Sequence, residues 1–74
     1  MFTYLDFNTL GLSEKAAALW QGTYLGDRRD NEHHIQLYRL EGFYAEAWYH
    51  TASNQISRIE ATTSNQVLAK YLQL

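Results

Sequence analysis

Two neighbouring segments, residues 33–40 and 43–50, constrain the fold of this chain most strongly. Both alternate in character and both are rich in Ile, Tyr, Phe and Trp, as strands of a half-buried sheet are. The dipeptide Glu41-Gly42 between them is a turn signal. The sequence therefore predicts a β-hairpin, on whose apolar face the remaining segments pack.

Two registers fit this hairpin. With a two-residue loop, Glu41-Gly42, Leu40 faces Phe43 and both faces mix polar and apolar residues. With a three-residue loop, residues 40–42, Gly42 takes the left-handed position of a bulge and Arg39 faces Phe43. The three-residue loop gathers on one face Ile35, Leu37, Phe43, Ala45, Ala47 and Tyr49. We predict the bulged register, because a one-residue slip moves every side chain to the other face and this partition is cleaner.

A helix is predicted from about residue 13 to residue 21. Ser13 is a good N-cap, Glu14 suits the first turn, and Gly22 suits the residue that ends a helix. The apolar stripe of this helix comprises Leu12, Ala16, Leu19 and Trp20. Residues 1–10 have no sustained period, and we expect a turn or short helical lead-in whose aromatic side chains cover one end of the core.

Two weaker strands and a closing helix complete the expected elements. Residues 23–29 favour an extended conformation with Thr23 and Leu25 facing the core, and residues 55–62 form a fourth strand after a turn at Asn54. Ser64 is a suitable N-cap for a helix over about 65–73. Helices this short form by packing on a sheet rather than alone.

These elements predict an α+β fold. The expected architecture is a two-layer sandwich in the order α-β-β-β-β-α, with a four-stranded antiparallel meander and both helices on one side. At 74 residues the chain has room for a single domain, residues 1–74, with a marginal core. The chain has no Cys, so neither a disulfide nor a thiolate metal site supplements that core.

The second face of the predicted sheet is where we expect the function. Besides Gln36, this face is predicted to carry Tyr24, Arg28, His34, Tyr38, Tyr44, Glu46, Trp48, His50, Ile56 and Arg58. Several exposed aromatic side chains on one surface would rival the largest apolar patch of a typical monomer, roughly 300–600 Å². Because Tyr, Trp and Arg are typical interface residues, we predict a non-catalytic interaction module. It would form a homo-oligomer, namely a dimer, or it would bind another protein. The contact would use this face or an edge strand.

Other interpretations compete with this one. In one of them, the aromatic residues only stabilise the sheet, through cross-strand pairs, and form no interface. Alternatively the face would stack single-stranded RNA or a small ligand, or His34, Glu46 and His50 would support a minor enzymatic activity. No catalytic residue or cofactor is predicted, because the chain has neither a glycine-rich phosphate-binding loop nor a serine placed at a strained turn between strand and helix. No metal site is predicted, because two histidines and one distant carboxylate do not make a zinc site.

Charge and hydropathy limit the partners. A net charge of −2 gives no long-range attraction for phosphate backbones, so nucleic acid is disfavoured. No apolar run approaches the roughly 18–20 residues of a membrane span, and the N-terminus lacks the pattern of a signal peptide. We therefore expect a soluble, cytoplasmic protein with no membrane partner.

Overall fold

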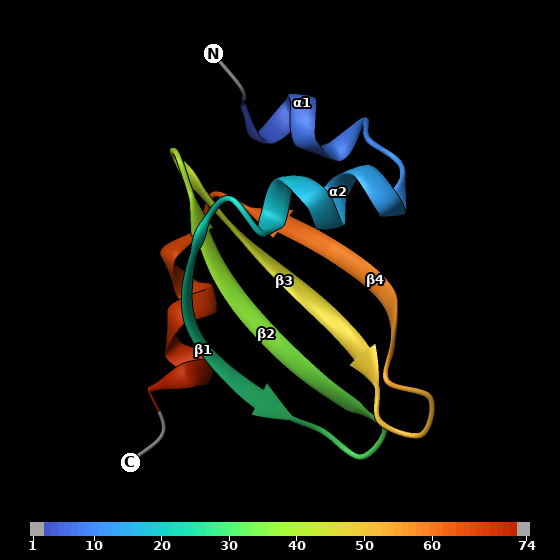
Figure 1. Ribbon diagram of the computed structural model, residues 1–74. Helices are drawn as coiled ribbons and strands as arrows, with labels where there is room; N and C mark the ends of the chain where they lie inside the picture. The colour runs from blue at the N-terminus through green and yellow to red at the C-terminus, as the bar shows by residue number, and fades with distance from the viewer. Residues whose placement is uncertain (1–2, 73–74) are drawn as a thin grey trace.

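A computed structural model describes residues 3–72, which form one four-stranded antiparallel sheet preceded by two helices and followed by one (Figure 1). The elements in chain order are α1 (Tyr4–Asn8), α2 (Leu12–Leu19), β1 (Thr23–Arg29), β2 (His33–Leu40), β3 (Phe43–His50), β4 (Gln55–Thr62) and the 3₁₀ helix η1 (Asn65–Tyr71). The strands lie in sequence order, so β1 and β4 are the edges of the sheet. This confirms the predicted α+β meander, with helical segments before and after it.

The two N-terminal helices begin where carboxylates bind free backbone N–H groups. The Asp6 carboxylate accepts a hydrogen bond from the Thr3 N–H at 3.0 Å, and the Glu14 carboxylate accepts one from the Gly11 N–H at 3.1 Å. Glu14 therefore starts α2 at Leu12, before the predicted cap Ser13. Each carboxylate thus supplies a hydrogen-bond acceptor at a helix start, where backbone N–H groups have no acceptor within the helix.

The end of α2 also differs from the prediction. The helix ends at Leu19, and Gly22 is not in the left-handed conformation. Gly22 is needed for another reason, because a Cβ atom there would lie 2.6 Å from the carbonyl oxygen of Arg39. The glycine thus lets the chain pass closely against β2 as it enters β1.

The hairpin has the two-residue loop, and the predicted bulged register is wrong. Leu40 lies opposite Phe43, and Gly42 has a φ of 86° in the turn. Ile35 and Leu37 consequently share a face with Trp48 and Glu46, their direct cross-strand partners. The prediction assumed that only one face of the sheet is buried, whereas helices cover both faces, so apolar residues are needed on each.

We call the two sides the helix face and the η1 face. The helix face carries Phe43, Ala45, Ala47 and Ile59, which form the main core with Phe7, Ala16 and Leu19 of α1 and α2. The η1 face carries Ile35, Leu37, Glu46 and Trp48, all buried. The small Ala45 and Ala47 lie under the N-terminal helices, where their short side chains leave room for a helix against the sheet.

The closing helix lies on the side opposite to the predicted one. Ser64 caps η1 as predicted, since its hydroxyl accepts a hydrogen bond from the Gln66 N–H at 3.1 Å. A Cβ atom at Gly26, which lies opposite Leu37 on the η1 face, would sit 3.9 Å from the Tyr71 ring. Figure 1 shows η1 on one side of the sheet and α1 and α2 on the other. The predicted two-layer arrangement left this side of the sheet open, whereas η1 covers it as a further layer.

Register shifts in both edge strands change the predicted faces further. The pairing of β1 with β2 shifts at Leu25, so Tyr24 faces the helix side whereas Arg28 faces η1. The pairing of β4 with β3 shifts at Ser57, which places Ile56 opposite Tyr49 on the helix face. A strict alternation along either strand could not predict these changes of face. Asn54 has a φ of 57°, a left-handed conformation that suits the turn predicted at this residue.

Candidate interaction surfaces

The residues predicted for one open face are divided between two covered faces. On the η1 face lie Arg28, Tyr44, Glu46, Trp48, His50 and Arg58. On the helix face lie Tyr24, His34, Gln36, Tyr38 and Ile56. The structure therefore does not bring the predicted set together on a single surface.

The aromatic residues in this set are mostly covered within the chain itself. Trp48 is only 6% exposed, and Tyr38 packs against the core beneath the N-terminal helices. Tyr24, at 50% exposed, is the large aromatic residue of the set that stays open to solvent. The predicted open aromatic face is therefore not formed in residues 3–72, and an interaction surface must involve other exposed residues.

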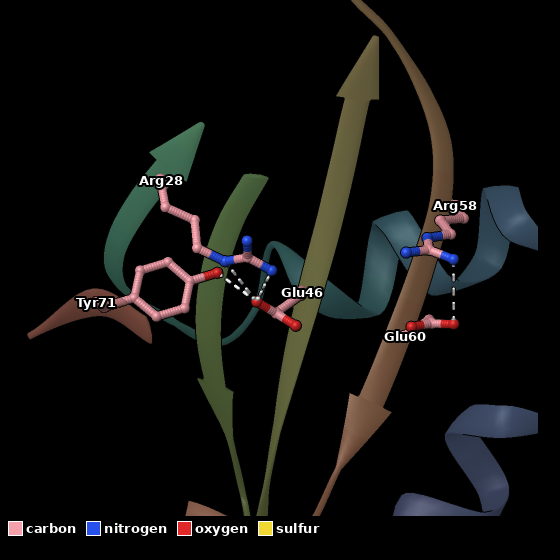
Figure 2. A network of polar contacts seen from close by, with 5 residues as sticks. All are labelled: Arg28, Glu46, Arg58, Glu60 and Tyr71. Carbon is pink, nitrogen blue, oxygen red and sulfur yellow. Dashed lines mark hydrogen bonds and ion pairs between the residues drawn. The ribbon is translucent and has the colours of Figure 1, made fainter. Parts of the chain in front are cut away.

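Glu46 is the centre of a buried polar network on the η1 face (Figure 2). One oxygen of its carboxylate, Oε2, accepts hydrogen bonds from Nε and Nη2 of Arg28 at 3.3 and 3.2 Å. The same oxygen accepts a hydrogen bond from the Tyr71 hydroxyl at 2.5 Å. Because Glu46 is 5% exposed, these donors offset the cost of removing its charge from water. The network joins β1, β3 and η1, and its chemistry is that of a structural contact.

Burial raises the pKa of the Tyr71 hydroxyl well above its ordinary value of 10, and the Glu46 carboxylate, which accepts a hydrogen bond from this hydroxyl, raises the pKa further. The folded protein thus keeps Tyr71 neutral at a pH where the unfolded chain releases the proton. The contribution of neutral Tyr71 to the free energy of unfolding is complete below pH 10 and is lost progressively as the pH rises above 10.

Replacing Tyr71 by phenylalanine is expected to reduce this alkaline loss of stability. Between pH 10 and pH 11 the wild type should lose up to about 1 kcal/mol more free energy of unfolding than Tyr71→Phe, because only the wild type takes up this proton on folding. Urea denaturation at a series of pH values measures both slopes. Equal slopes would show that Tyr71 ionises in the folded protein as it does in the unfolded chain.

The histidines do not form the predicted constellation. His34 and His50 lie on opposite faces, and Glu46 is bound to Arg28 rather than to either of them. Instead, the His33 and His50 rings lie 5.6 Å apart, and His34 Nε2 lies 2.6 Å from an oxygen of Asp27. Within residues 3–72 no group of three or more potential ligands is placed to hold a metal ion. The geometry therefore offers no support for chemistry by His34, Glu46 and His50.

The edge strand β4 carries an exposed pair of opposite charges, of which only Arg58 was predicted to belong to the site. The guanidinium of Arg58 lies over the Trp48 ring, 4.2 Å from its centre. Nη1 of Arg58 is 3.7 Å from Oε2 of Glu60 (Figure 2). The side chains of Arg58 and Glu60 are 56% and 59% exposed. Glu60 was not among the predicted site residues, although the alternation Arg58-Ile59-Glu60 places both charges on one face.

A second exposed feature lies between the end of α2 and the first half of β1. Trp20 is 63% exposed, Tyr24 50% and Leu25 42%. Trp20 was predicted on the buried stripe of the helix, but α2 ends one residue earlier. Leu25 was predicted in the core, but the register shift at this position removes it from regular alternation. The sequence signal that could have identified these residues is their closeness along the chain.

Comparison with known proteins adds no assignment. No family model, no curated protein and no solved structure matches this chain. Among the helices that the structure describes, none has the length and apolar character that would let it cross a membrane. The function must therefore be argued from the two exposed edges of the sheet.

Proposed function

We propose that this chain is a non-catalytic interaction module that forms a two-fold dimer by pairing the β4 edges of two copies. The observation that carries the proposal is the exposed pair Arg58 and Glu60, on either side of Ile59 in an edge strand. An unpaired edge presents a row of backbone N–H and C=O groups that another strand can bind. Covering this edge would also stabilise a domain that is marginal alone.

The spacing of the two charges makes β4 complementary to itself. If two antiparallel copies of β4 are related by a two-fold axis at Ile59, residue 58 of each copy faces residue 60 of the other. Arg58 then lies opposite the partner's Glu60, and this pairing occurs twice. Opposite charges directly across two strands contribute roughly 0.2–1 kcal/mol each. The contact of Arg58 with the Trp48 ring holds the guanidinium near this position before association.

Charges on an edge strand often serve to prevent pairing. Charged residues of one sign prevent pairing, because a second copy of the strand would bring like charges opposite one another. β4 carries both signs on one face at a spacing that becomes attractive in the antiparallel dimer. The pattern therefore favours pairing of two copies.

Reversing either charge alone is expected to weaken the dimer. Arg58→Glu and Glu60→Arg each place like charges opposite one another twice, so we expect the dissociation constant to rise about tenfold to a hundredfold. The double variant Arg58→Glu/Glu60→Arg restores both pairs and should dimerise nearly as the wild type does. Light scattering on a sizing column measures the mass over a range of concentrations.

The matched controls are Arg29→Glu, on the opposite edge of the sheet, and Glu41→Arg, in the β2–β3 turn. Both change charge by the same amount and should leave the dimer intact. A wild type that stays monomeric at high micromolar concentration would contradict the proposal. So would single variants whose masses follow the wild type at every concentration.

A further inference from the structure

The other edge strand, β1, differs from β4 in what surrounds it. The exposed side chains of Tyr24 and Leu25 belong to the N-terminal half of β1, and the exposed Trp20 precedes this strand at the end of α2. A hollow of about 590 Å³ lies at its C-terminal half, and the residues that line it are Asp27, Arg28, Arg29, Lys70 and Tyr71. One end of this edge is thus apolar, and the other carries several cations.

The charges around the hollow are not all available. Arg28 is bound to Glu46 at 3.2 Å, and Asp27 is bound to His34 at 2.6 Å. The hydrogen bond from His34 is the main cause that lowers the pKa of Asp27, so this carboxylate stays ionised and occupied. Within residues 3–72, Arg29 and Lys70 form no ion pair. These two exposed cations leave the hollow with positive charge for an incoming anion.

We propose that β1 binds an extended segment of another protein as a fifth, antiparallel strand, with acidic side chains beside Arg29 and Lys70 and apolar side chains beside Leu25, Tyr24 and Trp20. Backbone groups of an open edge supply the affinity in such pairing, and flanking side chains supply the specificity. Because the added strand runs antiparallel to β1, its acidic residues come first and its apolar residues follow.

Charged side chains on an edge strand protect it from pairing. In β1 the exposed charges are Asp27 and Arg29 of the C-terminal half, and Asp27 is paired with His34, whereas the first half of the strand carries no charge. The Arg28 side chain points into the buried network, and large apolar side chains remain exposed beside the first half of β1. Tyr and Trp are also the residues that most often anchor a bound partner. The inference is independent of the proposed dimer, because β1 and β4 are opposite edges of the sheet.

A labelled synthetic peptide tests this inference. The probe is an eight-residue amidated peptide, Glu-Asp-Glu-Thr-Val-Thr-Leu-Val, and its control replaces the three acidic residues by lysine. Fluorescence anisotropy should give a dissociation constant in the range of tens to hundreds of micromolar for the acidic peptide, and at least tenfold weaker binding of the lysine peptide. The net charge of −2 on the chain would by itself favour the lysine peptide. Tighter binding of the acidic peptide would therefore indicate a local cationic site.

Variants of the full chain locate the site. Arg29→Glu/Lys70→Glu should weaken binding of the acidic peptide at least tenfold, whereas the matched control Arg39→Glu, an exposed arginine of an inner strand, should change it less than twofold. Backbone amide shifts on titration should be largest in residues 24–29. The dimer-deficient Arg58→Glu chain should bind the peptide normally, which separates this inference from the proposed function.

Three results would overturn the inference. They are absence of binding at millimolar peptide in low salt, equal or tighter binding of the lysine peptide, and amide shifts centred on β4.

Discussion

Replacing Phe7 by alanine is expected to leave much of the protein unfolded at 25 °C. The Phe7 side chain is 0% exposed and lies 5.5 Å from the Phe43 ring, between α1 and the sheet. Removing a buried Phe side chain costs about 3–5 kcal/mol, because transfer free energy is lost and a cavity remains. A domain of 74 residues has a total free energy of unfolding of only about 4–11 kcal/mol.

Urea denaturation followed by circular dichroism measures the loss for Phe7→Ala. The matched control is Leu5→Ala, in the same short helix, where the side chain is 70% exposed and the expected loss is below about 0.5 kcal/mol. If Phe7→Ala lost no more stability than this control, α1 would not be docked on the sheet as described.

The second large effect is expected from Glu46→Ala. This change leaves the Arg28 guanidinium and the Tyr71 hydroxyl without their shared acceptor in a largely buried place. Removing one partner of a buried ion pair costs about 3–5 kcal/mol, and we expect roughly 2–4 here because the Arg28 side chain is 24% exposed. The change should also loosen η1, since Tyr71 is bound to the sheet through Glu46.

Glu60→Ala is the matched control, because Glu60 lies directly opposite Glu46 on the same face but is exposed. Its removal should change stability by less than about 0.5 kcal/mol, measured at a concentration where the chain is monomeric. Glu46→Gln, which keeps an acceptor oxygen, should fall between the two. An equal and small effect of Glu46→Ala and Glu60→Ala would contradict the role given to this network.

Much of the fold could be predicted from local signals. The alternating segments around Glu41-Gly42 marked β2 and β3, and Asn54 marked the turn before β4. Ser64 marked the start of the closing helix, which is a 3₁₀ helix rather than an α-helix. These signals act within a few residues, so they do not depend on how the elements pack against one another.

The faces of the sheet could not be predicted in the same way. The choice of register assumed one buried face, so residues as polar as Glu46 were assigned to solvent. In the structure Glu46 is buried because Arg28 and Tyr71, distant in sequence, supply its hydrogen bonds. Such a contact depends on which side of the sheet η1 covers, and periodicity does not contain that information.

The candidate surfaces were predicted least well. Arg58 and Tyr24 remain exposed as expected, but the residues that give them a role are Glu60, Trp20 and Leu25. Their exposure follows from the early end of α2, the register shift at Leu25 and the position of β4 at the edge. A sequence shows residue types at these positions, whereas exposure at an edge is a property of the assembled sheet.

An equimolar mixture of the Arg58→Glu chain and the Glu60→Arg chain tests the proposed dimer most directly. One chain carries carboxylates at both positions 58 and 60 and the other carries cations at both, so only the mixed pair is complementary across the two-fold axis. Sedimentation velocity should show each variant alone as a monomer of 8.6 kDa and the mixture as a species of about 17 kDa, twice that mass. A mixture that stays monomeric at concentrations where the wild type is dimeric would contradict the pairing of β4 edges.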